Sequence, residues 1–318
     1  MAAPTREGRG GSAGTTDHGT VFLVNPASEN GATGRRWPEI AHLPAERGLR
    51  GETLISERPG HLPELARRAV AEGASLLVVV GGDGTVNEVA NGIADAKDVE
   101  LAVIPRGTGW DFVRTHGIPR KLEGAIDTAR TGAVRELDLG RVTYRSWAGE
   151  EESSYFANIG SAGMSGAVAK RANATTKTLG GKVSYAWATF AVFARWRPDE
   201  MRVVVDDEER SGRMHDVVVA IGRYFGGGMK ICPEAAPDDG VFDVLLIGAV
   251  TKRDLVLTLP KIYRGTHLPH PKAELLRGRT VEIDGAEPVP IQLDGEQPGT
   301  TPVRFEIVPN ALRLRVPR

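Results

Sequence analysis

The sequence predicts an α/β protein that has an N-terminal open, mostly parallel sheet flanked by helices and a second, strand-rich domain. Short apolar runs alternate with segments of helical spacing from residue 20 to about residue 135, which is the pattern of βαβ units. Beyond residue 138 most segments have the pattern of strands joined by turns. The chain has 318 residues, which is enough for about two domains.

The first domain begins with a short apolar strand that ends at Pro26. Two later strands, at 76–80 and 101–105, are apolar throughout, as expected for strands that are covered on both faces. Segments 61–73 and 85–93 have the spacing of helices. Because ligands bind outside the carboxyl ends of the strands in such sheets, the loops that follow these strands are the candidate binding loops.

The domain limits follow from the change in pattern. Residues 1–19 are a glycine-rich tail, residues 20–138 form the first domain, and residues 139–305 form the second. The last strand, near 306–318, is expected to return to the first domain. Within the second domain and this last segment, strands are predicted at 155–160, 201–207, 215–222, 241–248, 280–284, 290–295, 303–308 and 312–316, and helices at 161–196 and 251–264.

Composition excludes several classes of protein. Forty basic and forty-one acidic side chains give a net charge of −1, which argues against binding nucleic acid by bulk charge. The single cysteine, Cys232, cannot form an internal disulfide and is expected to be structural, which suits the reducing cytoplasm. No apolar stretch reaches the roughly 18 residues of a transmembrane helix.

The first candidate loop follows the strand at 76–80. It contains Gly81, Gly82, Asp83 and Gly84, and a helix is predicted to begin at Thr85. Glycines allow a ligand to approach the backbone, and the N–H groups at a helix start favour an anion such as phosphate. An aspartate would repel phosphate unless a divalent cation such as Mg²⁺ lay between them. The alternative is a plain strand-to-helix turn with a capping aspartate.

Two further loops support the first. Gly107, Thr108 and Gly109 follow the next strand, before a helix that begins near Asp111, and parallel strands would bring both loops to one edge. The third loop is the segment 290–299, in which Asp294 and Glu296 flank Gly295. Its carboxylates would place a base beside a metal ligand. Asp-Gly is also a common hairpin turn, and the same dipeptide occurs at 239–240 and 284–285.

The four segments GGDGTVNE, PRGTGWDF, PDDGVFDV and LDGE, in this order, resemble the diacylglycerol kinase catalytic family of lipid kinases, including soluble bacterial diacylglycerol kinase-like and sphingosine kinase-like enzymes. The resemblance covers roughly residues 20–318. It implies an ATP-binding N-terminal domain, a C-terminal β-sandwich domain and an active site between them. ATP would be the co-substrate and Mg²⁺ the cofactor.

The resemblance also assigns roles to residues. Glu296 matches the proton acceptor and Asp294 its neighbour. Asp239 matches a ligand of a separate, structural Mg²⁺, with the backbone carbonyls of Ala236 and Val241 as companions. The residues that match nucleotide contacts are Asn25, Ser56 (where the family usually has Thr), Gly81, Gly82, Asp83, Gly84, Thr85, Val86, Asn87 and Thr108.

One departure and several alternatives stay open. Trp110 stands where the family usually has Asn, so the indole could stack on adenine, cover the cleft, or mark a changed substrate or lost activity. The alternatives to a lipid kinase are another kinase of the superfamily, such as an NAD kinase, and a non-catalytic nucleotide- or lipid-binding protein. The aromatic segment 183–198 is either a core helix or a lipid-contacting wall.

The expected partners are ATP and a lipid at a membrane surface, with no nucleic acid. The expected location is the cytoplasm, with transient membrane association. The acceptor is expected to be a diacylglycerol-like or related lipid that offers a hydroxyl. The sequence specifies neither the individual lipid nor the oligomeric state.

Overall fold

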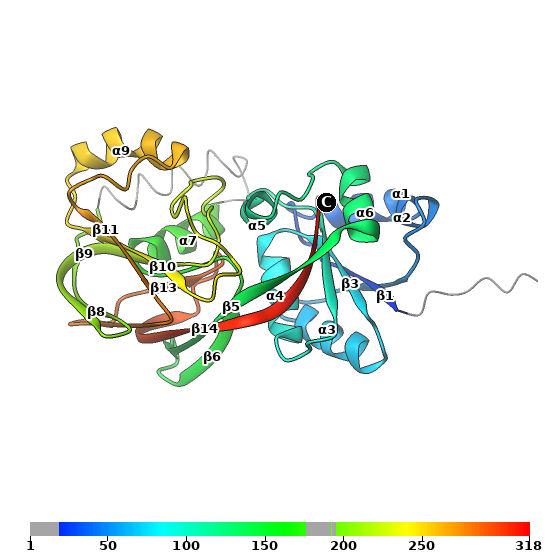
Figure 1. Ribbon diagram of the computed structural model, residues 1–318, viewed down its shortest axis with the longest axis horizontal. Helices are drawn as coiled ribbons and strands as arrows, with labels where there is room; N and C mark the ends of the chain where they lie inside the picture. The colour runs from blue at the N-terminus through cyan, green and yellow to red at the C-terminus, as the bar shows by residue number, and fades with distance from the viewer. Residues whose placement is uncertain (1–18, 176–191, 193–194) are drawn as a thin grey trace, which may run out of the picture.

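The computed structural model describes residues 19–175, 192 and 195–318. Figure 1 shows two lobes: an N-terminal lobe with helices around a sheet, and a C-terminal lobe made mostly of strands. Two long strands, β5 (Ala133–Ser146) and β14 (Gly299–Val316), run from one lobe into the other. The predicted fold class, an α/β domain followed by a strand-rich domain, is confirmed.

The N-terminal sheet is parallel through four neighbouring strands, in the order β2, β1, β3, β4. Their bounds are Thr20–Val24 for β1, Glu52–Ile55 for β2, Leu76–Gly81 for β3 and Glu100–Pro105 for β4. The end of β14 pairs in parallel with β4, and β5 pairs with β14 in antiparallel fashion. All four parallel strands therefore end at one edge of the sheet, where the candidate loops begin.

Helices cover both faces of this sheet. On one face lie α3 (Leu62–Ala71) and α4 (Asp83–Ile93), and on the other α1 (Ala32–Ile40) and α6 (Leu122–Thr131). Alternate residues of β3 point to opposite faces, so Leu77 joins the core under α3 and α4 while Val78 joins the core under α1 and α6. This explains why β3 is apolar at every position. Two short helices, α2 (Leu43–Glu46) and α5 (Asp111–Thr115), complete the lobe.

The C-terminal lobe consists of antiparallel strands in the order β11, β10, β9, β8, β12, β14, with β7 beside β9, β13 beside β7, and β6 beside β5. Phe156, Phe242 and Phe305 meet in its core, and the ring centroid of Phe156 lies 5.9 Å from that of Phe242 and 5.7 Å from that of Phe305. The remaining bounds are β6 Glu151–Phe156, β7 Ile159–Gly163, α7 Met164–Thr175, β8 Asp199–Val205, β9 Glu208–Ala220, β10 Phe242–Gly248, α9 Lys252–Arg264, β11 Ala273–Gly278, β12 Thr280–Gly285 and β13 Ile291–Leu293.

The end of the chain is one strand, β14, where the sequence predicts two. Its pairing with β5 shifts register between Val308 and Leu312. Within this irregularity Asn310 adopts a left-handed conformation, with φ of 52°, and its N–H donates to the Asp138 carboxylate at 3.0 Å. The polar break between the two apolar runs is therefore a bulge within a continuous strand.

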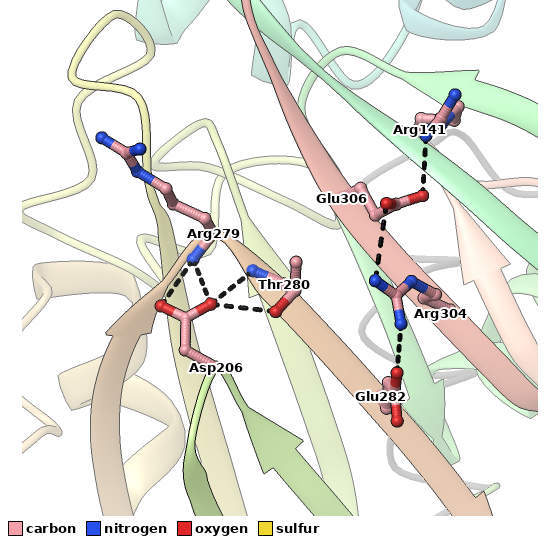
Figure 2. Close-up of polar contacts among 7 residues, drawn as sticks. All are labelled: Arg141, Asp206, Arg279, Thr280, Glu282, Arg304 and Glu306. Atoms are coloured by element: carbon pink, nitrogen blue, oxygen red, sulfur yellow. Dashed lines mark hydrogen bonds and ion pairs between the residues drawn. The ribbon is translucent and has the colours of Figure 1, made fainter.

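Charged side chains cross-link three strands on the surface of the C-terminal lobe, as Figure 2 shows. Arg141 of β5 pairs with Glu306 of β14 at 2.9 Å, Glu306 with Arg304 at 3.6 Å, and Arg304 with Glu282 of β12. Because these ion pairs are solvent-exposed, each contributes at most about 1 kcal/mol. They therefore add little to strands that the apolar core already holds together.

Two sequence predictions concern parts of the C-terminal lobe outside its sheets. The aromatic segment 183–198 lies largely outside the described residues. Cys232 is 1% exposed, and burial raises the pKa of its thiol, which fits the expected structural role.

Candidate active site

A cleft of about 470 Å³ is lined by residues of both lobes. The N-terminal lobe contributes the loops after β1, β3 and β4, and the C-terminal lobe contributes the loop after β13 and a glycine-rich loop at 225–227. The predicted residues that line the cleft are Asn25, Gly82, Asp83, Gly84, Thr85, Val86, Thr108, Asp294 and Glu296. Most of the predicted nucleotide and proton-transfer residues therefore share one cavity.

The loops after β3 and β4 contact each other through their backbones. A Cβ atom on Gly107 would lie 2.6 Å from the Cα of Gly82, a distance that real side chains do not tolerate. The Arg106 N–H also donates to the Gly81 carbonyl at 2.7 Å. Glycine is thus required for the two loops to meet, and their meeting is the convergence on which the phosphate-binding hypothesis depends.

The first turn of α4 opens onto the cleft. The helix begins at Asp83, two residues before its predicted start, because Gly82 is extended and the chain enters the helix directly after it. Residues 83–86 all line the cleft, and the N–H groups of residues 83–85, which precede the first hydrogen bond of the helix (Val86 N–H to the Gly82 carbonyl, 3.1 Å), lie at the cavity. Asn25 joins the first loop to this turn by donating from its side-chain amide to the Thr85 hydroxyl at 3.0 Å.

Asp83 and Asp111 form a pair of neighbouring carboxylates at the cleft. Asp83 accepts a hydrogen bond from the Phe112 N–H at 2.9 Å, and Asp111 accepts one from the Gly227 N–H at 2.7 Å. Burial, followed by the repulsion of Asp83, raises the pKa of Asp111 to about 7, while Arg114 at 2.8 Å opposes the shift. Burial also raises the pKa of Asp83. A cation between the carboxylates would relieve both effects.

Asp294 is the most heavily hydrogen-bonded carboxylate of the cleft. One oxygen accepts from the Ala157 N–H at 2.7 Å and from the Asn87 side-chain amide at 2.9 Å. The other accepts from the N–H groups of Asn158 at 3.1 Å and Ile159 at 2.8 Å. Burial raises the pKa of Asp294, but four donors leave no room for a proton, and we take the group as ionised. Asp294 therefore anchors its turn instead of exchanging protons.

Glu296 faces the cleft in a different environment. It belongs to the tight turn Leu293–Glu296, here called the catalytic turn, in which Leu293 and Glu296 exchange two backbone hydrogen bonds of 2.9 Å. Its side chain is accessible from the cleft, and partial desolvation raises its pKa. Glu88 of α4 lines the same cleft. Burial raises the pKa of Glu88, and the negative charge of Glu296 raises it further. Within the described part of the chain Glu296 is therefore a carboxylate without a fixed partner, suited to accept a proton.

An apolar cavity adjoins the cleft in the C-terminal lobe. Among the described residues it is lined mainly by side chains of β9, β10, α7 and α9, including Val168, Leu245 and Leu259. Phe225 lines both the cavity and the cleft, so the two are neighbours. A molecule with a polar head and an apolar chain could occupy both at once.

Trp110 does not line the cleft. Its side chain packs against the apolar core under α3 and α4, and Arg120 lies over its ring at 4.5 Å from the centroid. Its backbone is left-handed, with φ of 59°, a conformation that asparagine adopts far more readily than tryptophan. The family's usual Asn thus fits the backbone, and the indole points away from the nucleotide site.

Several predicted residues lie outside the cleft. Gly81 and Ser56 follow their strands at the same edge but are not among the lining residues, and Asn87 instead links α4 to Asp294. Asp239 is in a separate loop, where its carboxylate pairs with Arg277 and accepts from the Val241 N–H at 3.3 Å. The carboxylate is thus engaged by a guanidinium, which does not favour a metal ion at this position. The structural Mg²⁺ at Asp239, Ala236 and Val241 stays a prediction.

The sequence analysis also missed several cleft residues. Gly226 and Gly227 have left-handed backbones, with φ of 64° and 80°, and Gly227 holds Asp111. The run of three glycines at 226–228 is the signal that could have revealed this loop. Glu88 and Gln292 carry no local signal, because a polar residue on a helix or strand is usually solvated surface.

Comparison with known proteins identifies the family. The diacylglycerol kinase catalytic domain matches residues 19–142, and the YegS C-terminal NAD kinase beta sandwich-like domain matches residues 158–316, half of the chain. The chain belongs to the diacylglycerol kinase catalytic-domain family. The family predicted from the sequence is therefore confirmed, and the second domain is of the expected β-sandwich type. A kinase family implies ATP as the co-substrate.

Individual relatives of this family member cover nearly the whole chain. A diacylglycerol kinase of Staphylococcus carnosus is 27% identical over 298 residues, which is 93% of this chain and 94% of that protein. A crystal structure of a putative diacylglycerol kinase from Bacillus anthracis superposes with a TM-score of 0.77 at 23% identity, over 96% of this chain and 97% of the other. Yeast NADH kinase gives a TM-score of 0.50 at 10% identity, over 94% and 83% of the two chains. The two structural similarities show the fold alone.

Proposed function

We propose that the protein is an ATP-dependent lipid kinase that transfers the γ-phosphate to a hydroxyl of a diacylglycerol-like or related lipid. The observation that carries this proposal is the position of Glu296. Its accessible carboxylate faces a cleft that contains two glycine loops and a helix start, and an apolar cavity adjoins that cleft. A phosphate site, a base and an apolar chain site are the three parts that such a transfer requires.

The N-terminal lobe would hold the nucleotide phosphates. The N–H groups of residues 83–85 and of the loop 107–109 would donate to phosphate oxygens, and Asn25 and Thr85 would fix the first of these loops. Asp83 and Asp111 fit Mg²⁺, because two neighbouring carboxylates with raised pKa values gain from a cation, and this ion prefers one or two carboxylates plus phosphates. When bound, Mg²⁺ would neutralise phosphate charge.

Glu296 would accept the proton of the acceptor hydroxyl. The hydroxyl oxygen attacks the γ-phosphorus, a new P–O bond forms, and the bond from that phosphorus to the β,γ-bridging oxygen breaks to release ADP. General-base help of this kind contributes roughly 10²- to 10⁴-fold to the rate. Asp294 would act indirectly, by holding the catalytic turn through its four hydrogen bonds.

The apolar cavity would hold an acyl chain of the acceptor. A chain seated among Val168, Leu245 and Leu259 would place the lipid's polar end near Phe225, where the cavity meets the cleft. Burial of apolar chain surface contributes about 0.8 kcal/mol per CH₂ group. The cavity would therefore favour acceptors with long chains over free glycerol.

The helix α9 supports access from an anionic membrane surface. Val256 and Leu257 are 56% and 58% exposed, while Leu255 and Leu259 of the same helix line the apolar cavity. The helix also carries Lys252, Arg253, Lys261 and Arg264, and none of these four forms an ion pair within the described part of the chain. No described helix is long and apolar enough to cross a bilayer. We infer that α9 docks on anionic lipid, in the cytoplasm, and delivers the acceptor to the cavity.

The test is a kinase assay with radiolabelled ATP and a total lipid extract, followed by mass spectrometry of the product. The variant Glu296→Gln should lose at least about 100-fold in kcat while keeping its affinity for ATP, measured by calorimetry. The control Glu287→Gln removes an exposed carboxylate of the same lobe and should leave both unchanged. Near-normal turnover of the Glu296 variant would refute the assigned base.

The same assay separates the alternatives. Phosphate transfer to NAD and to no lipid would identify an NAD kinase. Binding of Mg-ATP without transfer to any lipid would identify a non-catalytic member of the fold. Either result would overturn the proposed function.

A further inference from the structure

Four buried polar side chains form a continuous row between the apolar cavity and the catalytic turn. Asp216 of β9 accepts from the Ser165 hydroxyl at 2.8 Å and from the Ser165 N–H at 3.2 Å. Ser165 contacts the Ser161 hydroxyl at 2.6 Å, and the Gln292 side-chain amide donates to Ser161 at 3.3 Å. The Gly295 N–H, inside the catalytic turn, donates to the Gln292 carbonyl oxygen at 2.7 Å. All four side chains belong to residues that are at most 4% exposed.

Counting donors gives this row a single direction. The Gly295 N–H must meet an acceptor, so the oxygen of the Gln292 amide faces the turn and its NH₂ faces Ser161. Ser161 therefore accepts from Gln292 and donates to Ser165. Ser165 in turn has only its own hydrogen to donate to Asp216. Every donor points away from the turn and toward the Asp216 carboxylate.

The far end of the row is an unusual place for a carboxylate. Asp216 lines the apolar cavity, and no cation pairs with it in the described part of the chain. Burial raises its pKa to about 7. Burying a carboxylate without a counter-charge costs free energy. The row of donors compensates part of this cost, because it ends on the Asp216 carboxylate as its one acceptor.

The near end of the row lies between the two carboxylates of the proposed reaction. Gly295 separates Asp294 from Glu296, and both Asp294 and Gly295 have left-handed backbones, with φ of 47° and 96°. Asp294 holds one side of this strained turn. The Gln292 oxygen holds the Gly295 N–H, next to the peptide unit that carries Glu296.

We propose that Asp216 and Gln292 are positioning residues, and that the directed row of hydrogen bonds between them sets the orientation of the catalytic turn and hence of Glu296. This inference rests on the proposed kinase function. It adds Asp216 to the residues that act in the proposed transfer, although Asp216 touches neither the nucleotide cleft nor Glu296. From the strand pairing, Asp216 lies opposite Gly163, four residues along β7 from the end that contacts Asp294, a span of about 13 Å.

The directionality makes a specific prediction for two single variants. In Asp216→Asn, the asparagine oxygen can accept from only one of the two Ser165 donors, because these donors bond to different oxygens of Asp216. The NH₂ group of the asparagine then faces the other donor. If it faces the Ser165 hydroxyl, the hydroxyls can reverse their direction, but the Ser161 hydrogen then faces the Gln292 NH₂ group. In Gln292→Glu, the row has an acceptor at both ends, and two hydroxyl hydrogens cannot satisfy three contacts. We expect each variant to lower kcat about 10-fold or more. Asp216→Asn should also leave the KM for ATP within about 2-fold of wild type, because Asp216 does not line the nucleotide cleft.

The double variant Asp216→Asn with Gln292→Glu tests the direction itself. Here the NH₂ group of the introduced asparagine would donate to Ser165, Ser165 to Ser161, and Ser161 to the new carboxylate, which still accepts from the Gly295 N–H. The side-chain contacts of the row are all satisfied with the direction reversed, and the net charge is unchanged. We expect the double variant to exceed both single variants about 10-fold in kcat.

Thr301→Val is the matched control, because it removes a buried hydrogen bond of 3.0 Å to the Val289 N–H in the same lobe, and neither residue belongs to the row. It should lower the unfolding temperature without lowering kcat. The inference is overturned when the two single effects simply multiply in the double variant, or when the single variants keep wild-type kcat. An inactive wild-type protein would instead refute the proposed function, so the two failures are distinguishable.

Discussion

Replacing Asp294 with asparagine exchanges one carboxylate oxygen for an NH₂ group in a site that contains only donors. Each oxygen of Asp294 accepts two hydrogen bonds, from Ala157 and Asn87 on one side and from Asn158 and Ile159 on the other. Whichever way the asparagine turns, its NH₂ group faces two donors. Because asparagine adopts a left-handed backbone readily, the φ of 47° adds no strain.

The size of the effect follows from this count. Leaving a buried polar group without its partner costs about 1–3 kcal/mol. Two such losses give about 4 kcal/mol, and at about 2–4 °C per kcal/mol for a protein of this size the unfolding temperature should fall by about 10 °C. The Asn87 contact also joins α4 to the C-terminal lobe, so the variant should loosen the docking of the two lobes.

Thermal unfolding followed by circular dichroism measures this effect, and Glu296→Gln is the matched control. That variant makes the same chemical change two residues away, where the side chain has no fixed hydrogen-bond partner among the described residues, so its unfolding temperature should stay within about 2 °C of wild type. Both variants should lose turnover, and only Asp294→Asn should lose stability. An Asp294 variant as stable as wild type would refute the reasoning that this carboxylate anchors the turn.

Three further predictions concern the base, the glycine contact and the departure from the family. Because the raised pKa of Glu296 leaves it protonated at low pH, kcat/KM should fall on acidification with a midpoint above about 4.3; a lower midpoint contradicts this. Gly107→Ala should weaken ATP binding about 10-fold by calorimetry, since its Cβ would lie 2.6 Å from Gly82, whereas Gly248→Ala, whose Cβ would meet nothing closer than 3.5 Å, should not. Trp110→Asn should cost about 1–2 kcal/mol of stability by urea unfolding through lost burial and leave kcat unchanged; a several-fold gain in kcat would show that the indole restrains the site.

The sequence was sufficient for the fold class and for the convergence of the glycine loops. Hydrophobic periodicity is a local property, and β3 and β4 express it over every residue because helices cover both of their faces. Once the sheet is parallel, its geometry places the loops after Gly81 and Pro105 side by side. Nothing about the side chains of the loops was needed to predict that they meet.

The partners of the catalytic turn could not be predicted in this way. Asn87 and Asp294 are separated by 207 residues, and Gln292 and Ser161 by 131. Asn87, Gln292 and Ser161 are polar residues on a helix or strand, which by pattern alone are typical of a solvated face. Their contacts exist because β13 pairs with β7 and α4 packs near β6, and one sequence carries no signal of either pairing.

Three of the four Asp-Gly dipeptides of the chain, at 239–240, 284–285 and 294–295, show how far the surroundings of a local motif decide its role. Among the described residues, Asp284 lies on the surface and accepts only from the N–H of the next residue, and Asp239 pairs with an exposed arginine. Asp294 accepts four hydrogen bonds from two other segments and orients Glu296 toward a cleft. Asp284 and Gly285 end strand β12, whereas Asp294 and Gly295 form the tight turn that the dipeptide favours, so the turn hypothesis and the site hypothesis for residues 294–296 were never in conflict. What makes this turn a candidate for chemistry is the set of donors around it, and that set is a property of the assembled sheet.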